Sequence, residues 1–352
     1  MACKSVISRI KPWLLNSKGY SFSDVDANIR LHLNESPIPP PKHVLEYVAE
    51  VLHHGNLYIN SKLFREFREL IADYVGVDVE SVFPYAGGDS ALRAVFHGLL
   101  EPGDRVLLLQ PTYSMFDVFT STRGLKKDVV NLEECGDWWC LDLTELIVKA
   151  KNADLVVVDD PNNPTGSPIL KGDFKLISEL AEAVKGFLLI DETYFEFSEY
   201  TAVPLIRDYP NIIVSRSMSK AFSLAGFRLG YLVSSPEVIE ALSKEYTPFD
   251  IPLPSLAAGV AALRDPSYVK TVVDVIKRNR DLMLRELRRL GIRSYNSLTN
   301  FILIRDSRDL RSLLLRHGIA IKAVGEDLYR VSVGSEEQCV KFIKVLGESG
   351  SV

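Results

Sequence analysis

The chain has 352 residues, enough for two domains, and 47% of them are hydrophobic, as in soluble globular proteins. Its formal net charge of −5 gives no electrostatic reason to bind nucleic acid, so small-molecule ligands are expected. The four cysteines lack the paired spacing of a zinc site and are interpreted as reduced thiols of a cytoplasmic protein. They are Cys3, Cys135, Cys140 and Cys339.

The first forty residues are expected to form an irregular arm. Residues 1–20 have apolar stretches too short for a signal peptide or a membrane span. Residues 34–41 contain four prolines, which forbid a helix and favour an extended segment that packs on another part of the protein. Helical periodicity follows over residues 42–53 and 62–74, and Tyr58 lies in the polar break between them. From its position alone, Tyr58 could either pack against neighbouring side chains or bind a ligand.

A glycine turn over residues 86–90 (AGGDS) follows a short predicted strand, residues 81–85, and precedes a predicted helix that ends near residue 100. Backbone N–H groups and the helix dipole converge at such a turn, and glycines let a phosphate approach the backbone. The turn has neither the Walker nor the GxGxxG spacing. Simple capping of the helix by Asp89 or Ser90 therefore explains it equally well.

Residues 103–217 alternate short apolar strands with amphipathic helices, which predicts a largely parallel sheet covered on both faces. The predicted strands are residues 105–110, 125–132, 155–159, 187–190 and 211–215, and the predicted helices are residues 113–122 and 143–151. Ligands of such sheets gather at the carboxyl ends of the strands. Polar clusters follow five strands, at residues 87–89, 111–113, 161–166, 191–194 and 220. Five independent loops explain this pattern poorly, so a ligand site is expected there.

Lys220 stands among hydroxyls, small residues and an arginine in an otherwise apolar stretch. Burial and a nearby cation can lower the pKa of a lysine from about 10.4 to roughly 7–8, as an amine nucleophile requires. Ser217, Ser219 and Arg228 could hold a phosphate beside this amine. A surface lysine on a polar loop remains the alternative from this segment alone.

Asp191 emerges from the apolar strand 187–190, so its carboxylate needs a cationic or strongly donating partner. A protonated heterocyclic nitrogen would satisfy it, and so would backbone donors or an arginine.

After residue 236 the pattern changes to one of long helices followed by strands, which indicates a second, α+β domain with a boundary near residues 235–250. The predicted helices are residues 236–244, 254–263, 266–290 and 336–346, and the predicted strands are residues 301–304, 319–321 and 329–333.

Taken together, these stretches resemble the class I/II aminotransferases, which are fold-type I pyridoxal-phosphate enzymes. The matching stretches follow the family order through nearly the whole chain: residues 33–37 (LNESP), 86–89 (AGGD), 111–113 (PTY), 161–166 (PNNPTG), 191–194 (DETY), 219–222 (SKAF), 225–228 (AGFR), 300–301 (NF) and 329–334 (YRVSVG). The resemblance implies an α/β fold with a mostly parallel, seven-stranded sheet in a large domain (residues 41–240). It also implies a smaller α+β domain (residues 241–352), joined by an N-terminal arm (residues 1–40).

The resemblance assigns roles around the ring of pyridoxal 5′-phosphate. Lys220 would bond covalently to the cofactor and, once displaced by substrate, carry a proton between the substrate carbon and the cofactor. Asp191 would keep the ring nitrogen protonated. Asn163 and Tyr194 would hydrogen-bond the ring 3-oxygen, and Tyr113 would stack on the ring face.

The resemblance also implies anion-binding residues and no metal. The cofactor phosphate would contact Gly88, Asp89, Ser217, Ser219 and Arg228. Tyr58 would reach the same phosphate and the substrate from a neighbouring subunit, which implies a homodimer with shared active sites. Arg330 would bind the substrate anion, with Lys322 and Asn34 also contacting the substrate.

Three positions depart from the family pattern. Ser90 stands where an acidic residue is usual, which shortens the acidic cap of a helix without touching the chemistry. Ile59 replaces a proline after Tyr58. Lys322 replaces an arginine, which keeps the positive charge but loses bidentate geometry at the phosphate end of the substrate.

Within the family, the chain most resembles the histidinol-phosphate aminotransferases. The expected reaction moves an amino group between histidinol phosphate and 2-oxoglutarate by a ping-pong route, in histidine biosynthesis. The alternatives are an aromatic or broad-specificity aminotransferase and a threonine-phosphate decarboxylase on the same scaffold, which Arg330 does not separate. A non-catalytic regulator of this fold would need a DNA-binding module, for which the first forty residues leave no room.

Overall fold

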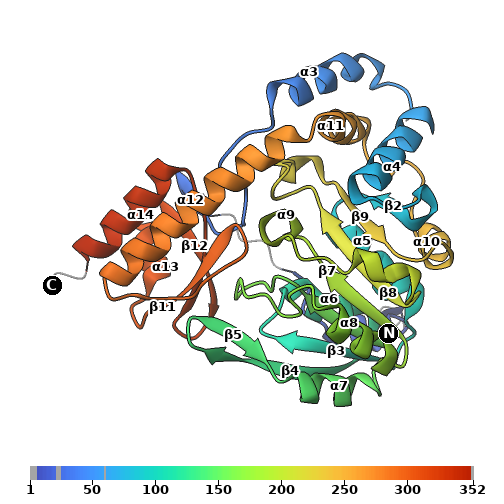
Figure 1. Ribbon diagram of the computed structural model, residues 1–352, viewed down its shortest axis with the longest axis horizontal. Coiled ribbons are helices and arrows are strands. Elements are labelled where there is room, and N and C mark those ends of the chain that lie inside the picture. Colours follow the sequence, from blue (N-terminus) through green and yellow to red (C-terminus); the bar gives the residue numbers. More distant parts are fainter. Residues whose placement is uncertain (1–5, 21–24, 59–60, 350–352) are drawn as a thin grey trace.

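The computed structural model describes residues 6–20, 25–58 and 61–349 of the chain (Figure 1). Two β-sheets organise it: an eight-stranded sheet built from residues 82–233, and a five-stranded sheet formed mainly by the C-terminal third. Helices pack against both sheets, so the architecture is α/β, as the alternation of apolar strands and amphipathic helices predicts.

The large sheet has the strand order β2-β9-β8-β7-β6-β3-β4-β5. Its strands are β2 (Val82–Tyr85), β3 (Arg105–Gln110), β4 (Lys126–Cys135), β5 (Trp138–Leu141), β6 (Leu155–Asp159), β7 (Phe187–Asp191), β8 (Ile212–Ser217) and β9 (Gly230–Val233). The strands from β8 to β4 run parallel, and the strands at both ends of the sheet are antiparallel to their neighbours. The sheet has one strand more than the seven expected, because the chain turns back at Gly136 (φ 63°) and adds β5.

The inner strands bury both faces, which explains their continuous apolar runs. Val157 of β6 packs on one face, in a cluster with Phe96 and Phe116 from the helices α5 and α6. Val158 packs on the other face, in a cluster with Ile177 of α8 that continues into the small sheet. The helices of this region are α3 (Lys42–Val51), α4 (Ser61–Val75), α5 (Gly88–Leu99), α6 (Ser114–Arg123), α7 (Leu143–Ala150), α8 (Phe174–Ala183), α9 (Phe195–Ser198), α10 (Pro236–Ser243) and α11 (Leu253–Arg264).

The small sheet has the order β1-β12-β13-β11-β10. Its strands are β1 (Ile29–Leu31), β10 (Arg293–Ser294), β11 (Phe301–Arg305), β12 (Ile319–Gly325) and β13 (Leu328–Ser332). The helices that accompany it are α12 (Ser267–Arg289), α13 (Leu310–Leu315) and α14 (Glu336–Glu348). Short 3-10 turns occur at η1 (Leu52–His54), η2 (Val79–Ser81), η3 (Val203–Arg207) and η4 (Ala225–Phe227).

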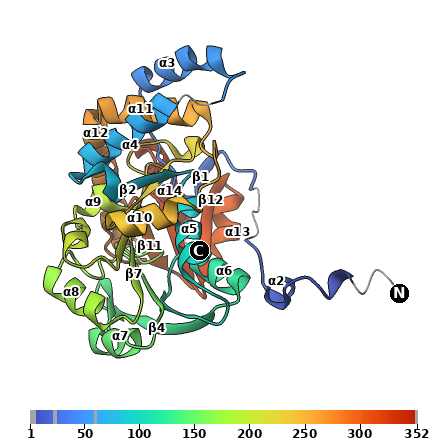
Figure 2. The ribbon, with the colours of Figure 1, turned by 90° about the vertical axis from the view of Figure 1, so that its right-hand side faces the viewer.

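The first forty residues are not irregular throughout, which corrects the expectation from the sequence. β1 pairs in parallel with β12, so this segment is part of the small sheet. A short helix, α2 (Pro12–Asn16), precedes β1 and contacts α6. Figure 2 shows the segment that contains α2 extending from one side of the molecule. None of the helices in the described part of the chain is long and apolar enough to cross a membrane.

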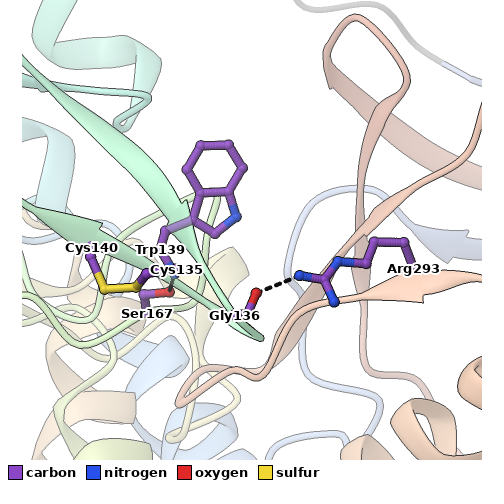
Figure 3. Close-up of a disulfide and its surroundings, with 6 residues drawn as sticks. All are labelled: Cys135, Gly136, Trp139, Cys140, Ser167 and Arg293. Atoms are coloured by element: carbon purple, nitrogen blue, oxygen red, sulfur yellow. Dashed lines mark hydrogen bonds between the residues drawn. A yellow bond between two sulfur atoms is a disulfide. The ribbon is translucent and has the colours of Figure 1, made fainter.

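Cys135 and Cys140 form a disulfide, so the interpretation of these two residues as reduced thiols is wrong (Figure 3). The antiparallel pairing of β4 with β5 brings their Cα atoms to 5.8 Å, within the range that a disulfide spans. Sequence spacing could not reveal this pair, because strand pairing creates the proximity. Cys339 is a buried free thiol, and Cys3 lies outside the described residues.

The disulfide closes a hairpin whose turn contacts the small sheet. Arg293 of β10 donates a hydrogen bond to the carbonyl oxygen of Gly136 (Figure 3). It donates another, of 2.9 Å, to Oδ1 of Asp137. Arg288 of α12 also reaches Asp137, with 3.3 Å between Nη2 and Oδ2. The β4–β5 hairpin is therefore one of the places where the two sheets are joined.

Candidate active site

A cavity of about 380 Å³ lies at the carboxyl ends of the parallel strands and extends to the small sheet. Twelve of the fourteen site residues predicted from the sequence line it, which brings together side chains far apart in the chain. They are Asn34, Gly88, Asp89, Tyr113, Asn163, Asp191, Tyr194, Ser217, Ser219, Lys220, Arg228 and Arg330. The two exceptions are Tyr58 and Lys322.

Lys220 lies three residues beyond the end of β8, with its Nζ 3.4 Å from the backbone oxygen of Leu33. Burial lowers the pKa of Lys220 to about 8, and the positive charges of Arg330 and Arg228 act in the same direction. Asp89 and Glu35 oppose this shift. A useful fraction of the amine is therefore free of its proton near neutral pH, as a nucleophile toward an aldehyde requires.

Asp191 is the last residue of β7 and is buried. Its Oδ1 accepts three hydrogen bonds: from Thr193 N (3.1 Å), Thr193 Oγ1 (2.8 Å) and Ser215 Oγ (2.8 Å). No hydrogen bond from the described residues goes to its Oδ2, and Asp191 lines the cavity. Burial raises the pKa of this carboxyl, so a cationic N–H donor in the cavity would relieve an electrostatic cost.

An anion site is formed where α5 begins. Gly87 has a φ of 91°, and a Cβ at this position would lie 2.7 Å from Nη2 of Arg228, so only glycine fits here. Nη2 of Arg228 lies 3.3 Å from Oδ2 of Asp89, in the first turn of α5. The hydroxyls of Ser217 and Ser219 line the same cavity. A helix N-terminus, a guanidinium and two hydroxyls together suit a phosphate group.

Three side chains on the cavity wall are held in defined orientations. Tyr113 Oη donates a hydrogen bond of 2.9 Å to Oδ1 of Asp89, and burial raises its pKa, so the phenol keeps its proton. Tyr194 Oη accepts a hydrogen bond of 3.0 Å from Nδ2 of Asn34. Oδ1 of Asn163 accepts a bond of 2.7 Å from Nη1 of Arg330. The amide nitrogen of Asn163 and the hydroxyl of Tyr194 can both donate to an oxygen anion in the cavity.

Arg330 on β13 provides the positive charge on the small-sheet side. Its Nη2 donates a bond of 2.8 Å to the backbone oxygen of His32, and its guanidinium lies 5.6 Å from the ring centre of Phe301. Its Nε is buried and has no hydrogen-bond partner among the residues that the structure describes. Such a guanidinium suits a carboxylate or phosphate of a substrate, which would compensate its burial.

The two predicted residues outside the cavity are both exposed. Lys322 on β12 lies directly opposite Arg330 in the strand register. Tyr58 has an exposed fraction of 81% and stacks on Phe249, with 4.6 Å between ring centres. Within a single chain, neither side chain lines the cavity. Ile59 lies outside the described residues.

Sequence reasoning missed several lining residues, of which Tyr20 and Asp159 are the most informative. Tyr20 belongs to the N-terminal segment and carried no sequence signal. Asp159 ends an apolar strand, just as Asp191 does, so the same reasoning could have found it.

A lysine, a buried carboxylate and an anion-binding helix N-terminus are gathered at the strand ends of an α/β sheet, an arrangement that suits enzymes with an aldehyde cofactor that carries a phosphate. The chain belongs to the family of class I and II aminotransferases, whose sequence pattern matches residues 26–346. The resemblance and the fold class predicted from the sequence are thereby confirmed.

Known relatives support this assignment over nearly the full chain. The chain is 50% identical over 339 residues to a histidinol-phosphate aminotransferase of Sulfurisphaera tokodaii, covering 96% of this chain and 95% of the relative. It is 32% identical to a histidinol-phosphate aminotransferase of Thermobifida fusca, covering 93% and 91% of the two chains. Its structure resembles that of histidinol-phosphate aminotransferase from Sinorhizobium meliloti in complex with pyridoxal-5′-phosphate, with a TM-score of 0.86, 26% identity and coverage of 97% and 98%.

Proposed function

We propose that this aminotransferase binds pyridoxal 5′-phosphate and moves an amino group between histidinol phosphate and 2-oxoglutarate by a ping-pong route, in histidine biosynthesis in the cytoplasm. The observation that carries the proposal is the arrangement of Lys220, Asp191 and the N-terminus of α5 around one cavity. The choice of substrate is supported by the 50% identical relative, a histidinol-phosphate aminotransferase.

The residues present fit the cofactor. Oδ2 of Asp191 lacks a hydrogen bond from the described residues and can accept one from the ring nitrogen, which it would keep protonated. Asn163 and Tyr194 can donate to the ring oxygen, and Tyr113 offers a ring face for stacking. The phosphate would be held by Gly88, Asp89, Ser217, Ser219 and Arg228.

When bound, the cofactor supplies an electron-withdrawing ring that stabilises negative charge on the substrate carbon. Lys220 would hold the cofactor through its Nζ and, once substrate has displaced it, would use the same atom to carry a proton between the substrate carbon and the cofactor. The lowered pKa of Lys220, about 8, suits both tasks, because the amine must bind and release a proton near neutral pH.

Substrate recognition would rest on Arg330, with Asn34 beside it in the cavity. Lys322 would act as a more distant positive charge, because it is exposed and faces Arg330 from the adjacent strand. The substrate phosphate would then be drawn by two cations, of which only Arg330 can make paired hydrogen bonds.

The assembly proposed is a homodimer with shared active sites. Tyr58 and Phe249 form an exposed aromatic pair, with exposed fractions of 81% and 51%. Contact with a second subunit would cover this pair and bring Tyr58 to the partner's cofactor phosphate.

The two sheets would belong to a large domain, residues 41–240, and a smaller one, residues 241–352, which the N-terminal arm joins.

The test is a comparison of amino donors with the purified, cofactor-loaded protein. Histidinol phosphate with 2-oxoglutarate should form glutamate with a higher kcat/KM than tyrosine, phenylalanine or threonine phosphate. A higher kcat/KM for an aromatic amino acid would change the assigned substrate, but the reaction would still be a transamination. Release of carbon dioxide from threonine phosphate without need for a 2-oxo acid would contradict the transaminase assignment.

A further inference from the structure

Two consecutive aspartates at the end of β6 are both buried but face different surroundings. Asp159 has an exposed fraction of 2% and lines the active-site cavity. Asp160 has an exposed fraction of 4% and is not among the lining residues. Its carboxylate accepts three backbone N–H bonds of 2.8 to 3.1 Å, from residues 169–171. The two side chains therefore form a natural pair for comparison: the same group, equally buried, inside and outside the site.

Asp159 joins two loops that carry proposed cofactor contacts. Its Oδ1 accepts hydrogen bonds from Thr112 Oγ1 (2.9 Å) and Asn162 Nδ2 (2.8 Å). Its Oδ2 accepts one from the backbone N–H of Asn163 (2.9 Å). Thr112 immediately precedes Tyr113 in the loop after β3, and Asn163 lies in the loop after β6. One carboxylate thus sets the relative positions of Tyr113 and Asn163.

The effect of Asp159 extends beyond these two loops. Oδ1 of Asn163 accepts the hydrogen bond from Nη1 of Arg330, which crosses to the small sheet. The backbone of Asn163 is held by Asp159 and its side chain by Arg330, so the amide has little freedom to turn. Asp159 is therefore linked to the proposed substrate-binding arginine through the hydrogen bonds of Asn163.

Asp159 is also a second carboxylate beside the proposed cofactor ring. It pairs with Asp191 in the register of the parallel strands β6 and β7, and both line the cavity. Burial and the charge of Asp191 raise the pKa of Asp159 to about 7, and the hydrogen bonds from Asn163, Thr112 and Asn162 oppose this shift. The other titratable and charged groups that line this cavity are Tyr20, Glu35, Asp89, Tyr113, Tyr194, Lys220, Arg228 and Arg330.

We propose that Asp159 is a positioning residue of this active site, which holds Tyr113 and Asn163 against the cofactor and which, in its ionised form, raises the proton affinity of the bound cofactor. This inference rests on the proposed function, since it concerns the same cofactor. A negative charge on a buried carboxylate stabilises a protonated nitrogen near it, which is the electrostatic basis for the expected effect on proton affinity.

The experiment compares Asp159→Asn with its matched control Asp160→Asn. Both variants replace a buried carboxylate by a neutral amide of the same shape, and both should lower the melting temperature of the cofactor-free protein. Only Asp159→Asn should weaken cofactor binding, by about tenfold, as the loss of a buried charge-assisted bond implies. The visible absorption of the bound cofactor changes with pH around an apparent pKa. Only Asp159→Asn should lower this apparent pKa, by about one unit, as removal of a nearby charge implies.

Thr112→Val separates positioning from charge and serves if Asp159→Asn does not fold. It removes one hydrogen bond to Asp159 but keeps the carboxylate and the branched side chain. We expect cofactor binding to weaken a few-fold, while the apparent pKa of the cofactor's visible absorption band falls by less than one unit, because the carboxylate remains and loses only one of its hydrogen bonds.

Two results would overturn the inference: equal effects of Asp159→Asn and Asp160→Asn on the bound cofactor, or unchanged cofactor binding in Thr112→Val. A wild-type protein that shows a visible band titrating with pH, together with either result, would leave the proposed function intact. A wild-type protein that develops no such band with pyridoxal 5′-phosphate would reject both proposals.

Discussion

Nη1 of Arg330 donates a hydrogen bond of 2.7 Å to Oδ1 of Asn163, and this bond links the small sheet to the large one. Arg330 is the proposed ligand of the substrate anion, and Asn163 is a proposed ligand of the cofactor oxygen. Because Oδ1 is occupied, the amide presents its Nδ2 for donation. The two binding functions are therefore coupled through one contact.

Replacement of Arg330 should affect substrate binding most. Arg330→Ala should raise KM for histidinol phosphate by roughly 10- to 100-fold, since hydrogen bonds to charged groups contribute about 1.5–3 kcal/mol. The release of Asn163 should add a smaller loss in kcat. Steady-state kinetics measure both effects. Lys322→Ala is the control and should raise KM less, because Lys322 is exposed. A larger rise in KM for Lys322→Ala than for Arg330→Ala would show that the main substrate contact lies on β12.

Replacement of Lys220 should abolish turnover. Lys220→Ala removes the only group proposed both to bond the cofactor and to move the substrate proton, although non-covalent cofactor binding should persist. Lys220→Arg keeps the positive charge without a usable amine and should be equally inactive. Turnover and cofactor retention after gel filtration are the measurements. Appreciable transamination by either variant would place the nucleophile elsewhere.

The pH dependence of cofactor capture follows from the lowered pKa of Lys220, about 8. The free amine is the reactive form, so it is present above this pH and lost as the pH falls through it. The rate at which the cofactor-free protein develops its visible band should rise with pH and level off above about 8. A rise that continues to the usual lysine pKa of 10.5 would show that Lys220 is not perturbed.

The buried ion pair between Arg216 and Glu192 should matter for stability. Nη2 and Oε2 lie 2.8 Å apart, and the side chains have exposed fractions of 4% and 1%. Arg216→Met should lower the free energy of unfolding by about 3–5 kcal/mol, because Glu192 is left buried without its partner. Arg216→Met with Glu192→Leu should recover part of this loss. Lys42→Ala, which breaks an exposed pair with Glu46, should cost less than 1 kcal/mol. Urea unfolding distinguishes these outcomes, and similar losses for Arg216→Met and Lys42→Ala would contradict the prediction.

The disulfide between Cys135 and Cys140 should contribute modestly. It closes a short loop, with a sequence separation of 5, so a chain-entropy model gives about 2 kcal/mol. The double variant Cys135→Ser, Cys140→Ser should melt at a lower temperature than the oxidised protein. A reducing agent should lower the melting temperature of the wild type but leave the double variant unchanged. An equal fall in the melting temperature of both proteins would show that the reducing agent acts on something other than this disulfide.

The inner strands were predictable because they are buried on both faces. Residues 105–110 and 155–159 were predicted as strands, and β3 and β6 have these bounds. The edge strand β5 was missed, since Trp138–Leu141 is short and follows a tight turn at Gly136. β1 was missed because its partner, β12, lies at the far end of the chain and only the tertiary fold brings them together.

The site residues that follow the parallel strands could be predicted from the sequence. The positions of those on the small sheet were harder to predict. Lys220, Asp191 and Asn163 follow parallel strands, whose carboxyl ends meet at one edge. The exposure of Lys322 depends on how the small sheet packs, which local pattern does not encode. Tyr58 lies on an exposed connection, so its proposed role depends on a second subunit.

The proposed reaction begins with transfer of the amino group from histidinol phosphate onto the cofactor of this enzyme. The most direct measurement is the visible absorption of the cofactor-loaded protein after histidinol phosphate alone is added. The band of the cofactor bound to Lys220 should disappear in proportion to the substrate consumed, and 2-oxoglutarate should restore it. A band that stays unchanged with histidinol phosphate would contradict the proposed reaction.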